Sequence, residues 1–177
     1  MTKRPCMNLI AAIATAALLP ASLLPATASA QEEPEFRGEY NDWRVFSRDT
    51  AEGPACYALS RPTDSAPRAH EHGNVYFLVS SWQSGVVEEQ PSLLVGYDLL
   101  PTSPPEVRVG SSRYDMYAAG QEGFLDDLED EPSLVRAMRR GSVMRVTATT
   151  SQGVATSYEF SLSGVTAALQ RVSALCR

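Results

Sequence analysis

Apolar and polar residues alternate over several stretches of this chain, as they do in strands that bury one face. The clearest stretch runs from Val154 to Leu162, where Tyr158 and Phe160 alternate with polar neighbours. The turn-forming segment Ser151-Gln152-Gly153 joins it to a second strand-like stretch, 143–150. Period-two alternation on both sides of a glycine-containing turn predicts an antiparallel hairpin.

Further segments have the β-branched and aromatic content that favours strands. They are 42–46, 55–60, 75–80, 93–97, 106–109 and 114–117. The last two flank Gly110-Ser111-Ser112 and predict a second hairpin. Segment 62–74 is rich in Pro, Asp, Ser and Gly, and we expect it to form a loop.

Helical patterns occur only near 132–140 and 164–175. In the first, Pro132 suits the opening turn, Gly141 follows the end, and arginines occupy the last turn. In the second, apolar residues recur on one face and Ser163 is placed to cap the start. We therefore predict a mainly β domain, an antiparallel sandwich or partly closed barrel with these two helices.

The first thirty residues have the features of a secretory signal peptide. Lys3 and Arg4 precede an uncharged apolar stretch, Leu9 to Leu24, and Ala28 and Ala30 match a signal peptidase site. The alternative is an uncleaved membrane anchor, which the dilution of the stretch by Ala, Thr and Pro disfavours. The prediction is a signal peptide over 1–30, a flexible acidic tail over 31–38 and one domain over 39–177.

Removal of that segment makes the protein more acidic. The whole chain has a formal net charge of −6, and without Lys3 and Arg4 the remainder stands at −8, with 13 Arg and no Lys. Such a surface repels nucleic acid and disfavours adsorption onto anionic lipid. We expect a periplasmic or secreted protein with no transmembrane segment after cleavage, and leave association with the outer membrane open.

Two cysteines remain after Cys6 leaves with the signal peptide, namely Cys56 and Cys176. An even number in an exported protein predicts a disulfide, here one that holds the last helix. The alternative is a pair of reactive thiols. Thiol reactivity calls for a Cys-x-x-Cys motif or a basic, His-rich setting, and neither surrounds these residues.

Candidate catalytic or metal-binding residues are few. His70 and His72 have a ligand spacing but lie in the predicted loop, and we expect two exposed histidines. The acidic residues of 126–131 lack the glycine and spacing of an EF-hand loop, so a solvated cluster that complements the helix dipole is favoured over a calcium site. The sequence therefore predicts no catalytic residue, no metal ligand and no cofactor.

Several short motifs, in order along the chain, resemble the invasion-associated locus B family. They are Asp42-Trp43-Arg44-Val45, Cys56-Tyr57-Ala58-Leu59-Ser60-Arg61-Pro62, Val75-Tyr76-Phe77-Leu78-Val79-Ser80, Val95-Gly96-Tyr97, Ala137-Met138-Arg139-Arg140-Gly141, and Ser161-Leu162-Ser163-Gly164 leading to Cys176. The resemblance extends from about Tyr40 to Arg177. One departure is that Phe46 and Ser47 stand where some relatives have a further cysteine.

The resemblance implies a secreted or envelope-associated bacterial protein, linked by the family name to entry into host cells. It implies no reaction and no catalytic residues. We therefore expect a non-catalytic module whose partner is an envelope or host-surface protein. The alternative is an envelope hydrolase or metal-dependent enzyme that uses the loop of His70 and His72.

Overall fold

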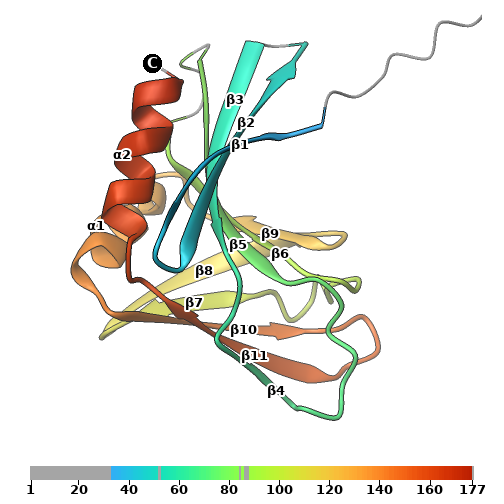
Figure 1. The fold of residues 1–177 in the computed structure, drawn as a ribbon. Helices are drawn as coiled ribbons and strands as arrows, with labels where there is room; N and C mark the ends of the chain where they lie inside the picture. The colour runs from blue at the N-terminus through green and yellow to red at the C-terminus, as the bar shows by residue number, and fades with distance from the viewer. Residues whose placement is uncertain (1–32, 52, 84, 86–87, 177) are drawn as a thin grey trace, which may run out of the picture. The chain divides into compact units, whose positions relative to one another are not determined.

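The computed structural model describes residues 33–176, except 52, 84 and 86–87. The predicted signal peptide, 1–30, lies outside these residues. The described strands form one antiparallel sheet of 11 strands in the order β1-β2-β3-β5-β6-β9-β8-β7-β10-β11-β4 (Figure 1). The two end strands, β1 and β4, do not pair with each other, so the sheet is open.

The strands and helices have the following bounds. The first six strands are β1 (Glu35–Tyr40), β2 (Trp43–Thr50), β3 (Gly53–Ser60), β4 (Asp64–Ala66), β5 (Tyr76–Trp82) and β6 (Gln90–Leu94). The others are β7 (Glu106–Val109), β8 (Ser112–Ala119), β9 (Glu122–Leu125), β10 (Val143–Thr149) and β11 (Ala155–Ser161). The helices are α1 (Asp130–Arg140) and α2 (Val165–Leu175).

The predicted fold class is confirmed, because the sheet is antiparallel and accompanied by two helices near the expected positions. Figure 1 shows β1, β2 and β3 running at a wide angle to β7, β10 and β11. Inward side chains from both groups of strands share one core, in which Trp43, Phe77 and Phe160 are fully buried. The Trp43 indole N–H donates to the Ser161 carbonyl at 3.0 Å, so burial leaves this donor satisfied.

The tail predicted over 31–38 is wrong for residues 35–38, which belong to strand β1. Phe36 pairs with Phe46 of β2, and Arg37 donates from Nε to the Ser47 hydroxyl at 2.6 Å. The register shifts between Phe36 and Gly38, which places a β-bulge in this edge strand. These residues form a strand because they pair with β2, and the acidic, proline-containing sequence does not indicate this pairing.

Other strands also differ from the prediction: β6 covers Gln90–Leu94 where 93–97 was expected. Strand β4 lies within the segment 62–74 that was expected to be a loop, and it pairs with β11 over three residues. Strand β9 was not predicted, because its four residues are too few to show a period and include Gly123. Both are short strands whose formation depends on a neighbouring strand.

Helix α2 begins differently from the prediction, since its N-cap is Gly164 and Ser163 does not cap it. The Ser163 hydroxyl instead accepts a hydrogen bond from the Asn41 side chain at 2.9 Å. Gly164 has φ of +91°, and a Cβ built there would lie 1.9 Å from the Tyr40 carbonyl oxygen. The helix therefore starts where the chain crosses the β1–β2 turn too closely for a side chain.

The far end of α2 is joined to the sheet by a disulfide between Cys56 of β3 and Cys176, whose Cα atoms are 5.9 Å apart. Along its length, α2 buries Val165, Ala168, Leu169 and Val172. Figure 1 shows the helix lying beside β1, β2 and β3, in agreement with its contacts. Within the described part of the chain, no helix is long and apolar enough to cross a membrane.

Candidate functional site

The face of β1, β2, β3 and β5 that points away from α2 carries aromatic, aliphatic and arginine side chains. We call it the outer aromatic face. It comprises Phe36, Arg44, Phe46, Arg48, Tyr57, Leu59, Tyr76 and Leu78, together with Arg61, which directly follows β3. On the opposite side of the same strands lie Trp43, Val45, Ala58 and Phe77, which are fully buried. Both faces of this part of the sheet thus carry large apolar side chains, but only one faces the core, and the other also carries arginines.

Three aromatic rings form a ladder across β1, β2 and β3. The Phe36 and Phe46 ring centroids are 5.6 Å apart, and those of Phe46 and Tyr57 are 5.7 Å apart with nearly parallel planes. Cross-strand pairing of these residues sets the spacing. Phe36, at the end of the ladder, is 54% exposed. The ladder therefore presents ring surface to solvent.

Arginines lie on the same face as the ladder, beside its rings. Arg44 makes an ion pair with Glu39 at 3.2 Å. The Arg61 guanidinium lies 5.0 Å from the centre of the Tyr76 ring and donates to the Tyr76 hydroxyl at 2.6 Å. This contact holds the guanidinium on an aromatic face, a geometry that lysine does not reproduce.

The electrostatic environment of Tyr57 combines burial with a nearby cation. Burial raises the pKa of Tyr57, and the charge of Arg48 acts in the opposite direction. The phenol therefore stays neutral and remains a hydrogen-bond donor at physiological pH. The Tyr57 hydroxyl and the Arg48 guanidinium thus both offer hydrogen-bond donors at the ring ladder.

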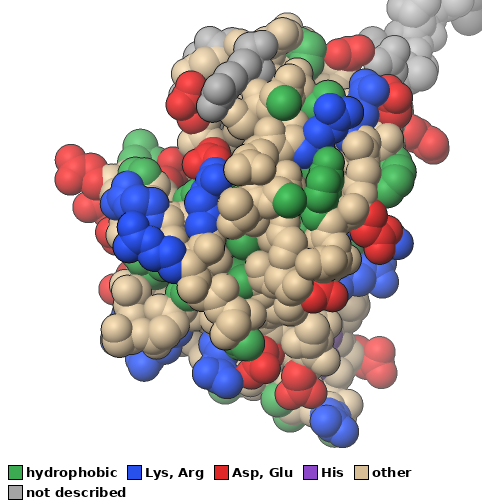
Figure 2. All heavy atoms as spheres, turned by 60° about the vertical axis from the view of Figure 1, so that its left-hand side comes forward, with side chains coloured by type: hydrophobic (Ala, Val, Ile, Leu, Met, Phe, Trp, Pro, Cys, Tyr) green, Lys and Arg blue, Asp and Glu red, His purple; other side chains and the backbone are tan. Residues whose placement is uncertain are grey.

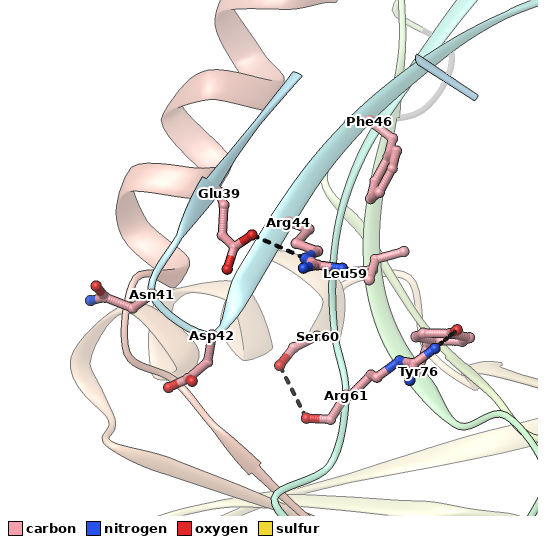
Figure 3. A pocket seen from close by; sticks show the side chains of 9 residues that line it. All are labelled: Glu39, Asn41, Asp42, Arg44, Phe46, Leu59, Ser60, Arg61 and Tyr76. Carbon is pink, nitrogen blue, oxygen red and sulfur yellow. Dashed lines mark hydrogen bonds and ion pairs between the residues drawn. The ribbon is translucent and has the colours of Figure 1, made fainter. Parts of the chain in front are cut away.

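A hollow of about 510 Å³ lies at one end of the outer aromatic face. Figure 3 shows Glu39 and Arg44 on one side of it and Arg61 and Tyr76 on the other, with Leu59 between them. The β1–β2 turn contributes Asn41 and Asp42 to its lining. The hollow combines an apolar floor with groups of both charges, which suits a polar side chain or short peptide segment rather than a purely apolar ligand.

The prediction that His70 and His72 are exposed is wrong, because both are partly buried. The His70 ring packs edge-on against those of His72 and Tyr97, with centroids 5.1 and 5.7 Å apart. The His72 ring packs in the same way against Tyr158 of β11. The backbone N–H of Gly96 also donates to the His72 carbonyl at 3.2 Å. These contacts pack the loop against the sheet.

Both ring nitrogens of His72 are engaged. Nε2 is 3.1 Å from the Pro67 carbonyl, which only accepts, so Nε2 carries the proton and donates. In the neutral ring, Nδ1 then accepts from the Tyr158 hydroxyl at 2.9 Å. The network continues from Tyr158 to Tyr97 at 2.8 Å and from Tyr97 to Thr156 at 2.6 Å.

This network ties the loop to the sheet and leaves His72 without a free nitrogen to act as a base or ligand. Burial and the hydrogen bond with Tyr97 both raise the pKa of Tyr158, so its phenol stays protonated. Nε2 of His70 is buried and has no hydrogen-bond partner within the part of the chain that the structure describes. The loop is therefore packed onto the sheet through His72, whereas His70 keeps one ring nitrogen without a partner among the described residues.

The acidic residues of 126–131 extend from the end of β9 into the first turn of α1. Asp130 and Glu131 are in the first turn of α1, where negative charge is favourable. The Asp127 carboxylate accepts a hydrogen bond from the backbone N–H of Glu129 at 2.9 Å. Among the described residues, no three His, Cys, Asp or Glu side chains are grouped closely enough to hold a metal ion.

A family model described as "Invasion associated locus B (IalB) protein" matches residues 43–173. The chain belongs to this family. The resemblance seen in the sequence motifs is thereby confirmed, and family membership associates the chain with bacterial invasion without assigning a reaction.

A solved structure supports the same fold. The chain is similar to the crystal structure of invasion associated protein B from Bartonella henselae, with a TM-score of 0.55 and 17% identity over 81% of this chain and 97% of that chain. At this identity the likeness concerns the fold. No curated protein matches this chain.

The outer aromatic face was not identified from the sequence, although the sequence contains a trace of it. Along β2 and β3, the positions that alternate with the core are expected to be polar. In β2, Phe46 follows the core residue Val45, and in β3, Tyr57 and Leu59 flank the core residue Ala58. All three occupy such positions. Apolar residues on both faces of strands near a sheet edge are the pattern that would have revealed it.

Proposed function

We propose that this chain is an exported, non-catalytic envelope protein that binds a partner protein through the outer aromatic face. The observation that carries the proposal is the ladder of Phe36, Phe46 and Tyr57, in which Phe36 is exposed and the other two rings are half-buried, with arginines beside it. Contiguous exposed apolar surface on a folded domain marks an interaction site. Tyr, Phe and Arg are also the residues enriched in protein interfaces, whereas Lys is depleted.

Export and family support the same proposal. A disulfide between Cys56 and Cys176 suits an oxidising compartment, as does the predicted signal peptide. Membership of an invasion-associated family suits an envelope or host-surface partner. The alternative, an enzyme that uses His70 and His72, has less support, because His72 is committed to hydrogen bonds within the fold.

The test is capture of a partner from envelope extract by the protein purified from the periplasm after expression of the full chain. The variant Phe46→Thr/Tyr57→Thr removes two rings of the ladder and keeps residues that favour strands. The control, Leu128→Ser, removes an apolar side chain that is 69% exposed but lies in the loop before α1.

We expect a specific partner that wild type and Leu128→Ser capture equally and that the ladder variant loses. Circular dichroism and a thermal melt confirm that each variant is folded. Equal capture by all three proteins would show that the outer aromatic face is not the binding surface. A measurable hydrolytic activity lost on replacement of His72 would favour the enzymatic alternative.

A further inference from the structure

A second surface feature is a groove between helix α1 and the β7–β8 turn, with a volume of about 370 Å³. Helix α1 contributes Ser133, Arg136 and Arg140, the turn contributes Ser111, and β8 contributes its first residue, Ser112. No Asp or Glu is among the residues that line this groove. The groove is therefore lined by hydrogen-bond donors and positive charge in an otherwise acidic protein.

The two arginines of the groove lack carboxylate partners. Within the described residues, neither Arg136 nor Arg140 makes an ion pair, whereas Arg139 of the same helix pairs with Glu89. Arg136 and Arg140 are one helical turn apart, so their side chains leave the helix on the same side. Attraction to the helix dipole accounts for Arg140 in the last turn but not for Arg136, which lies a turn earlier.

Figure 2 shows the wider setting of charge. On the face in view, Lys and Arg side chains gather in a few clusters, with Asp and Glu side chains between them. Positive charge on the chain is thus local, and an anion meets attraction only where a cluster lacks acidic neighbours.

The groove is built on a rigid base. Tyr114 is only 5% exposed, and its hydroxyl lies 3.3 Å from that of Ser133, which joins the floor of the groove to α1. Gly141, at the end of α1, allows a close approach to β7, because a Cβ there would lie 2.7 Å from Cγ1 of Val109. The helix end and the turn are therefore held at a fixed separation.

We propose that this groove binds a monoester phosphate group, either as free phosphate or as the terminal phosphate of a lipid headgroup. Two guanidinium groups and several hydroxyls offer more donors than the two oxygens of a carboxylate can accept, whereas a phosphate monoester presents three oxygens and a charge of about −1.5 to −2. Guanidinium forks match phosphate geometry. This site is separate from the outer aromatic face and does not depend on the function proposed for that face.

The test compares two double variants that remove the same charge. The double variant Arg136→Gln/Arg140→Gln alters the groove. The control, Arg68→Gln/Arg145→Gln, alters two arginines outside the groove whose side chains are 89% and 69% exposed. The probes are inorganic phosphate and vesicles of phosphatidylcholine with or without phosphatidic acid, whose phosphate is a monoester. Amide NMR shifts of Gly110, Ser111 and Ser112 report binding of phosphate, and sedimentation reports binding to vesicles.

We expect saturable binding of at least one phosphate probe, at least tenfold weaker in the groove variant and unchanged in the control. Shifts with inorganic phosphate identify a site for the free group, and binding only to vesicles that contain phosphatidic acid identifies a headgroup site. Equal affinity in the two double variants, or no binding of either probe, would overturn the proposal. Unchanged thermal melts ensure that the groove variant is folded.

Discussion

At the scale of single residues, Gly164 is the position where backbone geometry leaves the least freedom. It combines a positive φ with a carbonyl oxygen where a side chain would stand. Helix α2 and the β1–β2 turn can meet there only because the residue has no Cβ. A small change at this point should therefore disturb two elements at once.

We expect Gly164→Ala to lower the free energy of unfolding by at least about 2 kcal/mol, since the new methyl adds a clash to the strain of positive φ. Gly153→Ala is a matched control. Gly153 also has a positive φ, of +84°, but nothing lies within 4 Å of its Cβ position. The control should lose about 1 kcal/mol, from backbone strain alone. Urea unfolding measures the free energy of unfolding of both variants. Equal losses would show that the clash with the Tyr40 carbonyl adds nothing to the backbone strain.

The network around Tyr158 makes a prediction about alkaline pH. Burial, followed by the hydrogen bond with Tyr97, raises the pKa of Tyr158 above the value of 10.0 expected in the unfolded chain. A phenol with a raised folded-state pKa contributes stability below the unfolded pKa and loses it as pH rises. The free energy of unfolding should therefore fall above about pH 10.

Tyr158→Phe should make this alkaline fall shallower, whereas Tyr117→Phe, at a residue that is 47% exposed, should leave it unchanged. Chemical unfolding at a series of pH values measures the slope. At neutral pH, Tyr158→Phe should cost about 1–3 kcal/mol for the hydrogen bonds lost with His72 and Tyr97. An alkaline slope identical to that of wild type would show that Tyr158 does not govern this dependence.

At the scale of elements, helix α2 depends on tertiary and covalent attachment. It has eleven residues, a length at which an isolated helix is marginal in water. Its apolar face packs on the sheet, and the disulfide joins its end to β3. The helix should therefore loosen before the sheet when the bond is lost.

Cys176→Ser should lower the free energy of unfolding by about 2–5 kcal/mol. Limited proteolysis of this variant should begin in α2. The double variant Cys56→Ser/Cys176→Ser should lose about as much as the single one, since both remove the same bond. Thiol titration of the unreduced wild type should find no free thiol in the folded protein. Two free thiols would show that Cys56 and Cys176 are not bonded.

The elements that the sequence predicts well are those with their own periodicity. The β10–β11 hairpin alternates over both strands, and α1 combines an early proline, late arginines and a following glycine. Strands β4 and β9 are too short to show a period, and β1 forms by pairing with β2. The contacts of His72 with Tyr158 and the outer aromatic face could not be predicted, because they depend on which strands become neighbours.

At the scale of the whole molecule, export precedes everything proposed for its function. We expect Gln31 to be the first residue of the mature protein, because Ala28 and Ala30 fit the peptidase site. N-terminal sequencing of periplasmic protein measures this directly. Replacing Ala28 with Leu should block cleavage at that site. Wild-type periplasmic protein that retains Leu9 to Leu24 would contradict the prediction.

The open sheet has two free edges, and both discourage growth into larger aggregates. Strand β1 contains a bulge and carries Glu35 and Arg37, and β4 has three residues followed by Pro67, which lacks a backbone N–H. Bulges, charges, short strands and proline each hinder the addition of another strand. A protein that exposes aromatic rings on one sheet face can thus remain dispersed at high concentration, because its edges give a fibril no template.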